Sequence, residues 1–415
     1  MFRPLKITLL LFTILLGLSG CKNVADYSNA CKLIDCELAG FKTTSTVPTD
    51  IASYPMMTVE TKANTYIESS YRQSSPLHDS YGFLLPYDLN VANAGEPETH
   101  GQQADAAMWN SVALANMCML QAAGNTTLDT EISTLWANIR DQLLTSDGRP
   151  IRHPQSPDEL TISRDIMGAF QYLGAIAFHF NCVPVKSEFG EWIARMTDYG
   201  RNHNWEMGIG LTNPTVTTLT NRRQLSVVLE LYGKSTENLD IASSTENLSQ
   251  QSFLADYIFE NTHYCRRGFA GACIRTANFG SFANNLTYQS AVTMTIGRRH
   301  GVSQSYTENE LKAIWLNIAK VGDSVGKNNW LFVAGYRYWN QSTPTFNDIK
   351  QFLAESFPTT LPGSANAIEG WGCSDFIWQR VPYQICKTGV ASTWGYTYIG
   401  NDYLSLYAYI KLAGS

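Results

Sequence analysis

The sequence predicts a mainly α-helical protein organised as an α/α toroid, in which a ring of about six inner helices is surrounded by about six outer helices, with long loops and minor β structure. Two observations support this fold class. Segments in which apolar residues recur with helical spacing follow one another along most of the chain, and two kinds of segment alternate. One kind is apolar on every side, and the other carries a single apolar stripe opposite a polar face.

The segments of the first kind are expected to be the inner helices. A helix that is hydrophobic on all sides is stable only when other elements cover it completely. These segments are 104–120, 162–180, 225–232, 286–296, 330–339 and 403–412.

The striped segments stand between them and are expected to be the outer helices. In the clearest of them, Ile132, Leu135, Trp136 and Ile139 recur at offsets of three and four, and the intervening positions are mostly polar. The others are 59–67, 189–199, 253–258, 311–318 and 346–353.

Two stretches, 205–218 and 363–400, are rich in Gly, Thr and aromatic residues without helical spacing, which predicts long loops or short strands. The pattern of helices repeats, but no set of residues repeats with it, so a solenoid of near-identical units is disfavoured. An irregular helical bundle remains the alternative architecture.

The N-terminus has the features of an export signal. Arg3 and Lys6 precede an apolar run over 7–18, which ends in Ser-Gly before Cys21. This end resembles the lipobox of bacterial lipoproteins, and the resemblance implies cleavage before Cys21 and acylation of that cysteine, with Lys22 after it favouring the outer membrane. An ordinary secretory signal is the alternative. The predicted organisation is a signal peptide at 1–20, a lipidated tether at 21–57 and one toroid domain at 58–415.

Charge and cysteine content fit an exported protein. The net charge of -6 argues against a nucleic-acid partner. Apart from Cys21 there are eight cysteines, an even number that suits disulfides in an oxidising compartment. We expect the pairs Cys31–Cys36, Cys265–Cys273, Cys373–Cys386 and Cys118–Cys182, the last because both cysteines lie near the ends of inner helices. Other pairings stay open. No CxxC pair or HExxH motif is present, so no metal site is predicted.

The layout of helices resembles the α/α-toroid glycoside hydrolases and polysaccharide lyases of bacteria. The resemblance rests on this pattern and on two short stretches, 100–109 with an Asp that opens an inner helix, and Arg152-His153-Pro154 followed by Ser163-Arg164-Asp165. It implies that loops feeding the inner helices line a cleft for a sugar chain, where acidic residues perform the chemistry.

Asp105 and Asp165 are the strongest catalytic candidates on physical grounds. Each lies at the start of an apolar helix, where a charge cannot go deeper without a large desolvation cost. If the two helices are neighbours about 8–10 Å apart, their carboxylates fall near the ~6.5–9.5 Å separation of inverting glycosidases. The alternative is that both are helix-end charges, stabilised by the macrodipole and paired with Arg152 or Arg164.

A helix N-terminus lowers a carboxyl pKa, whereas a general acid needs a raised one. The acid is therefore also sought among Glu96, Glu98 and Asp79, with His100 and His153 as further candidates. The residues expected to contact substrate are His100, Trp109, Arg152, His153, Arg164, Trp371 and Trp394, the aromatic ones because flat rings stack on sugars.

The sequence has no GxSxG elbow, P-loop or dinucleotide fingerprint, and it predicts no cofactor. Two functions follow as hypotheses. The chain is either a membrane-anchored enzyme that cleaves a polysaccharide, as an inverting glycoside hydrolase or a polysaccharide lyase, or a non-catalytic surface lipoprotein that binds glycan or an envelope protein. In both cases the expected partners are a glycan and the lipid bilayer.

Overall fold

A computed structural model describes residues 53–85, 106–155, 164–203, 219–237, 239, 265–267, 273–275, 281–302, 308, 311, 315, 330–360 and 399–414. In α6, α8 and α10 the side chains are described from residues 167, 222 and 288 onward. Several predictions of the sequence analysis lie outside these residues. They concern the signal peptide, the tether up to residue 52, the segment 253–258, and Cys21, Cys31, Cys36, Glu96, Glu98, His100, Asp105, Trp371, Cys373, Cys386 and Trp394.

The described part of the chain is mainly helical, as the sequence predicts. Its helices are α3 (Met57–Tyr66), which continues into the π-helical turn η2 (Ile67–Tyr71), α4 (Ala106–Ala122), the 3-10 turn η4 (Thr126–Leu128), α5 (Asp129–Gln142), α6 (Arg164–His179), α7 (Val185–Asn202), α8 (Leu219–Leu231), α10 (Ser281–Arg299), α12 (Trp330–Asn340), α13 (Asn347–Ser356) and α15 (Asn401–Gly414).

Two short strands, β1 (Cys265–Arg267) and β2 (Cys273–Arg275), form an antiparallel pair. Cys265 lies opposite Arg275, and Cys273 lies opposite Arg267. The backbone therefore brings the predicted partners Cys265 and Cys273 onto neighbouring strands, two positions apart in register.

The two predicted kinds of helix differ in burial as expected. In α4 every side chain from Ala106 to Leu120 is buried, and in α15 every side chain from Asn401 to Ile410 is buried. In α5 the residues Ile132, Leu135, Trp136 and Ile139 are buried, whereas most of the positions between them are at least partly exposed to solvent.

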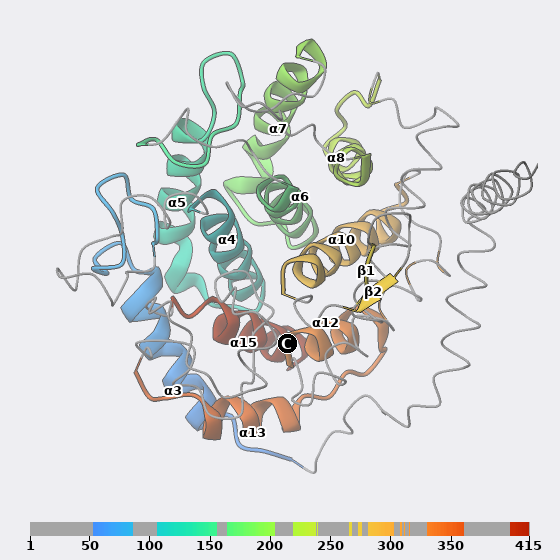
Figure 1. The fold of residues 1–415 in the computed structure, drawn as a ribbon. Helices are drawn as coiled ribbons and strands as arrows, with labels where there is room; N and C mark the ends of the chain where they lie inside the picture. The colour runs from blue at the N-terminus through green and yellow to red at the C-terminus, as the bar shows by residue number, and fades with distance from the viewer. Residues whose placement is uncertain are drawn as a thin grey trace, which may run out of the picture.

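Five of the fully apolar helices form a central group. They contact one another in the order α4, α6, α10, α12 and α15, and α15 contacts α4 again. The helices α3, α5, α7 and α13 lie outside this group, as Figure 1 shows. The remaining apolar helix, α8, contacts both α6 and α10, although these two helices also contact each other.

The central helices run in the same direction. Between α15 and α4, Asn401 Nδ2 donates to the backbone oxygen of Trp109 at 3.3 Å, and four residues later Ser405 donates to Asn116 Oδ1 at 2.8 Å. Between α6 and α10, the rings of Tyr172 and Tyr288 lie 6.4 Å apart near the middle of the helices, and His179 meets His300 at their ends.

The helices α10 and α12 also run in the same direction, because Tyr288 stacks on Phe332 of α12 and, further along both helices, Arg299 donates to the backbone oxygen of Trp339. The N-terminal ends of the central helices therefore form one face of the molecule, the N-terminal face. Their C-terminal ends form the opposite one, the C-terminal face.

The outer helix α3 runs the other way. Its Glu60 pairs at 3.0 Å with Lys411 near the C-terminal end of α15, whereas its last residue, Tyr66, packs on Tyr403 near the start of α15 at a ring distance of 4.6 Å. The described chain therefore enters the fold at the C-terminal face.

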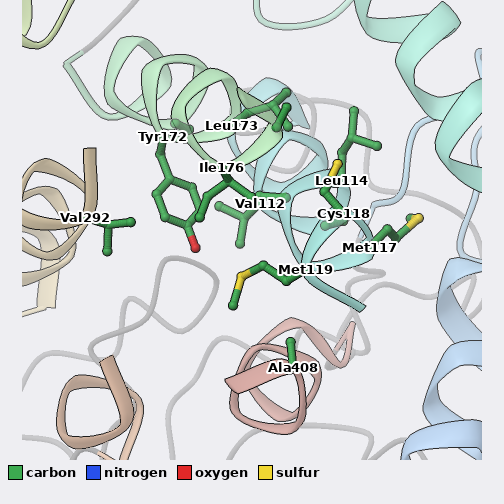
Figure 2. Packing of buried hydrophobic residues seen from close by; sticks show 14 of the residues in the cluster. Val112, Leu114, Met117, Cys118, Met119, Tyr172, Leu173, Ile176, Val292 and Ala408 are labelled. Carbon is green, nitrogen blue, oxygen red and sulfur yellow. The ribbon is translucent and has the colours of Figure 1, made fainter. Parts of the chain in front are cut away.

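Aromatic side chains fill the centre of the molecule. Tyr172, Tyr288 and Tyr409 come from α6, α10 and α15, and the hydroxyls of Tyr288 and Tyr409 are hydrogen-bonded to each other. Trp339 Nε1 donates to Tyr409 at 3.0 Å. Burial raises the pKa of all three tyrosines, so they are neutral hydrogen-bonding groups. Figure 2 shows Tyr172 with its hydroxyl directed between α4 and α10, on the side of Met119.

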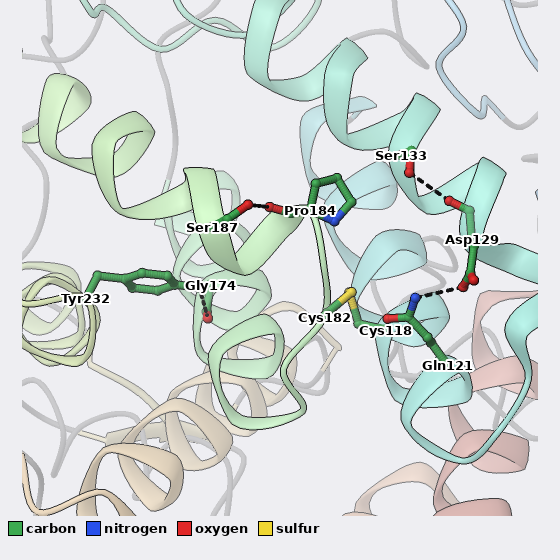
Figure 3. Close-up of a disulfide and its surroundings, with 9 residues drawn as sticks. All are labelled: Cys118, Gln121, Asp129, Ser133, Gly174, Cys182, Pro184, Ser187 and Tyr232. Atoms are coloured by element: carbon green, nitrogen blue, oxygen red, sulfur yellow. Dashed lines mark hydrogen bonds between the residues drawn. A yellow bond between two sulfur atoms is a disulfide. The ribbon is translucent and has the colours of Figure 1, made fainter.

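The predicted disulfide between Cys118 and Cys182 is confirmed. The two Cα atoms lie 5.3 Å apart, and the bond spans 64 residues of sequence. Cys118 is in the last part of α4 and Cys182 follows α6, so the bond joins these parallel helices at their C-terminal ends (Figure 3).

Candidate functional site

Two loops meet at the N-terminal end of α4, on the N-terminal face. The buried Asn110 accepts from the backbone nitrogen of Leu84 at 2.8 Å and donates to the backbone oxygen of Leu84 at 3.0 Å. The backbone nitrogen of Ala107, in the first turn of the helix, donates to the backbone oxygen of Arg152 at 3.2 Å. The Ala107 bond satisfies a backbone donor that a helix start would leave unpaired, and the Asn110 bonds pair the backbone of Leu84. Together they hold both loops against the first turns of α4.

A buried histidine and aspartate join the same two loops. Nε2 of His153 lies 2.6 Å from Oδ2 of Asp79, and the backbone nitrogen of Gln155 donates to Nδ1 of His153 at 3.1 Å. Because Nδ1 accepts a hydrogen bond, the ring proton lies on Nε2 and is donated to Asp79. The other carboxylate oxygen of Asp79 accepts from the backbone nitrogens of Tyr81 and Phe83 at 2.9 and 2.8 Å.

This geometry corrects the prediction that His153 contacts substrate. The side chain has 0% exposure, both of its ring nitrogens are occupied, and the rings of Tyr81 and Phe83 lie edge-on against it. The turn that carries these rings also depends on Gly82, which has a φ of 79°. His153 and Asp79 are therefore positioning residues that hold the loops against α4.

The start of α15 carries a carboxylate that the sequence reasoning missed. Asp402 is the second residue of this helix and is completely buried. Burial first, and then the charge of Asp402, raise the pKa of the neighbouring Tyr71. The hydroxyl of Tyr71 donates to Asn401 Oδ1 at 2.7 Å and accepts from Asn116 at 3.1 Å, which ties the start of α15 to η2 and α4. The signal was present, because Asp402 opens an apolar helix just as Asp105 and Asp165 do.

Trp109, which the sequence analysis predicts to contact substrate, has a buried indole donor without a partner among the described residues. It lies in the first turn of α4 and is 4% exposed, and the donor atom is its indole Nε1. A buried donor without a partner costs about 1–3 kcal/mol. An oxygen atom of a ligand or water would remove this penalty, so Trp109 remains a candidate for ligand recognition.

The structure places the other candidates as follows. The backbone of Arg164 and Asp165 forms the first turn of α6, which is parallel to α4, so both residues belong to the N-terminal face. Arg152 is partly buried in the loop at the start of α4. Three aspartates thus open or directly precede neighbouring central helices: Asp105 before α4, Asp165 in α6 and Asp402 in α15.

No group of three or more His, Cys, Asp or Glu side chains among the described residues is arranged to hold a metal ion. Within the same ranges, no helix is both long enough and apolar enough to cross a bilayer. Comparisons of the chain with protein-family models, with curated proteins and with solved structures find no match, so no relative suggests a function and the residues themselves must indicate it.

Proposed function

We propose that this chain is a lipid-anchored, glycan-directed enzyme that cleaves a polysaccharide on its N-terminal face. One observation carries the proposal. The parallel helices α4, α6 and α15 begin on the same face, and each has an aspartate at its start: Asp105 directly precedes α4, and Asp165 and Asp402 are the second residues of α6 and α15. Several carboxylates on one face of a rigid scaffold are what glycoside hydrolysis requires.

The architecture that we propose for this enzyme is the α/α toroid. The closed series of contacts among five parallel helices supports it, as does the location of α3, α5, α7 and α13 outside them. In a regular toroid of six inner helices α8 would separate α6 from α10, but these two helices touch. In the proposed ring α6 and α10 are therefore direct neighbours, whereas the sequence predicts that α8 lies between them.

For the chemistry we assign Asp165 as the base, because a helix N-terminus keeps a carboxylate ionised. The acid is left among Asp105, Glu96 and Glu98. Adjacent helix axes about 8–10 Å apart would give the carboxylate spacing of an inverting hydrolase. His100, Trp109, Arg152, Arg164, Trp371 and Trp394 are proposed to contact the sugar chain.

The test is incubation of the purified mature protein with a panel of polysaccharides. New reducing ends report hydrolysis or elimination, and ultraviolet absorbance of unsaturated sugars identifies a lyase. On a confirmed substrate, Asp165→Asn should lower turnover by about 10²–10⁴ with the fold intact. The matched control is Asp141→Asn, on the exposed side of α5. Full activity of both Asp105→Asn and Asp165→Asn would show that these aspartates are only helix-end charges.

A second candidate, a non-catalytic lipoprotein that binds glycan or an envelope protein, is favoured by the filled centre of the molecule. Tyr172, Tyr288 and Tyr409 occupy the middle of the central group, so a ligand cannot pass deep between these helices. Calorimetric binding of a glycan without any release of reducing ends, and without any effect of Asp165→Asn, would identify this function.

A further inference from the structure

The C-terminal face carries a cluster of cations and aromatic rings that the proposed chemistry does not use. We call it the basic-aromatic patch. It consists of Phe178, His179, Phe180, Lys186, Arg298, Arg299, His300, Tyr338 and Trp339, from the ends of α6, α10 and α12 and the start of α7.

Two cations of the patch, Arg299 and Lys186, are held against rings. The guanidinium of Arg299 lies 4.9 Å from the centre of the Trp339 ring and donates to the backbone oxygen of that residue at 2.8 Å. The ammonium of Lys186 lies 4.7 Å from the centre of the Phe178 ring. Among the described residues, the one ion pair of the patch is the exposed contact of Arg298 with Glu308 at 3.5 Å. Among the residues that the structure describes, most of the positive charge of the patch therefore has no ion-pair partner.

Burial and the positive charge of the patch lower the pKa of two neighbouring histidines. Nδ1 of His179 lies 3.1 Å from Nε2 of His300, so one ring donates to the other. Burial, then His300 and Arg299, lower the pKa of His179 to about 4. Burial, then Lys186 and Arg299, lower the pKa of His300. Apart from burial, both shifts come from neighbouring basic groups.

The chain enters the fold on this same face. Tyr54 donates through its backbone nitrogen to Asn347 at the start of α13, and Glu60 pairs with Lys411 at the end of α15. Two of the three large hydrophobic side chains that stand exposed among the described residues also lie here, Met57 at the start of α3 and Val183 in the turn after α6. About 30 residues separate Cys21 from residue 53, a length that spans at most about 100 Å.

We infer that the C-terminal face rests on an anionic lipid bilayer through the basic-aromatic patch, so that the N-terminal face points away from the membrane. This inference relies on the lipid anchor of the proposed function. Lys and Arg near an anionic surface each contribute about 1 kcal/mol, and aromatic rings with a polar edge favour the membrane interface. The tether brings the patch to the bilayer, and the patch then sets the orientation of the protein.

The test is hydroxyl-radical footprinting of the acylated full-length mature protein on vesicles, read by mass spectrometry. On phosphatidylglycerol vesicles, Phe178, Phe180 and Tyr338 should be oxidised less than on phosphatidylcholine vesicles, and salt should abolish the difference. The variant Lys186→Glu/Arg298→Glu should lower the ratio of patch-bound to free protein by at least about fivefold for each substitution, because each one removes a cation and adds an anion. Arg195→Glu is the matched control, because this exposed cation contacts Thr145 in the loop that reaches the start of α4.

The outcomes separate the inference from the anchor. The mass of the N-terminal peptide first shows whether Cys21 is acylated. An unacylated peptide would contradict the lipid anchor of the proposed function, and the footprinting of that unacylated protein on the same vesicles would still test the patch. Acylated protein with equal oxidation on both kinds of vesicle would overturn the inference and leave the proposed enzyme intact. Protection by soluble dextran sulfate, with none by anionic vesicles, would instead assign the patch to an anionic glycan and also overturn it.

Discussion

The Nε2 atom of His153 lies 2.6 Å from Oδ2 of Asp79, and this single buried contact fastens two loops in front of α4. His153→Ala should lower the free energy of unfolding by about 1–3 kcal/mol, because Asp79 then keeps a buried oxygen without its donor. Chemical denaturation measures the change. His203→Ala is the control, since His203 is exposed at the end of α7. Equal stability of the two variants would show that the contact contributes nothing.

A second buried pair joins α12 to α13. Arg337 and Asp348 are 3% and 8% exposed and make two bonds of 2.7 and 2.8 Å. Asp348→Asn leaves a buried guanidinium without its countercharge and should cost about 3–5 kcal/mol of stability. Asp141→Asn removes one partner of an exposed pair with Arg140 and should cost about 1 kcal/mol or less. A loss for Asp348→Asn no larger than for Asp141→Asn would contradict this account.

Acid should destabilise the protein through His179. Its pKa is about 4 in the folded state and near 6.5 when unfolded, so between these values the unfolded state binds more protons. The contribution is therefore complete above about pH 6.5 and is lost as the pH falls toward 4. The charged groups that face His179 are His300 and Arg299, and His300 shifts in the same direction.

The measurement for this prediction is denaturant unfolding at pH 7 and at pH 4.5. His179→Gln should reduce the loss of stability between these two values, and His203→Gln should leave it unchanged. If His179→Gln loses as much stability as the parent protein, the histidine does not carry the pH dependence.

The disulfide between Cys118 and Cys182 should contribute about 4 kcal/mol, since it closes a loop of 64 residues in the unfolded chain. Replacement of both cysteines by Ser should lower the denaturation midpoint accordingly. Peptide mapping under non-reducing conditions should recover the two peptides as one species. Recovery of both cysteines as free thiols would refute the bond.

If the chain carries the proposed lipid anchor, Cys21→Ser should abolish acylation, because the lipid would be attached through this thiol. Metabolic labelling with palmitate should then disappear, and the protein should stay unprocessed or leave the membrane fraction. Undiminished labelling of the variant would show that Cys21 is not the lipidated residue. Labelling of Cys31→Ser, a nearby cysteine that is predicted to pair with Cys36, should be unaffected.

The helices themselves follow from the sequence alone. The six fully apolar segments match α4, α6, α8, α10, α12 and α15, and four of the six striped segments match α3, α5, α7 and α13. The periodicity of apolar residues predicts them because it records how many faces of a helix are covered. The same reasoning paired Cys118 with Cys182, since both lie near the C-terminal ends of fully apolar helices.

What only the tertiary structure decides is which side chains from distant segments meet. No local pattern indicates that His153 is sealed between Tyr81 and Phe83, that α6 contacts α10 although α8 contacts both, or that Arg299 at the end of α10 lies over the ring of Trp339 in α12. Periodicity fixes the buried face of one helix, but the partner of a polar group is fixed by packing between helices, where a shift of one residue changes the contact. For this reason the sequence predicts the scaffold closely and the roles of single polar residues only in part.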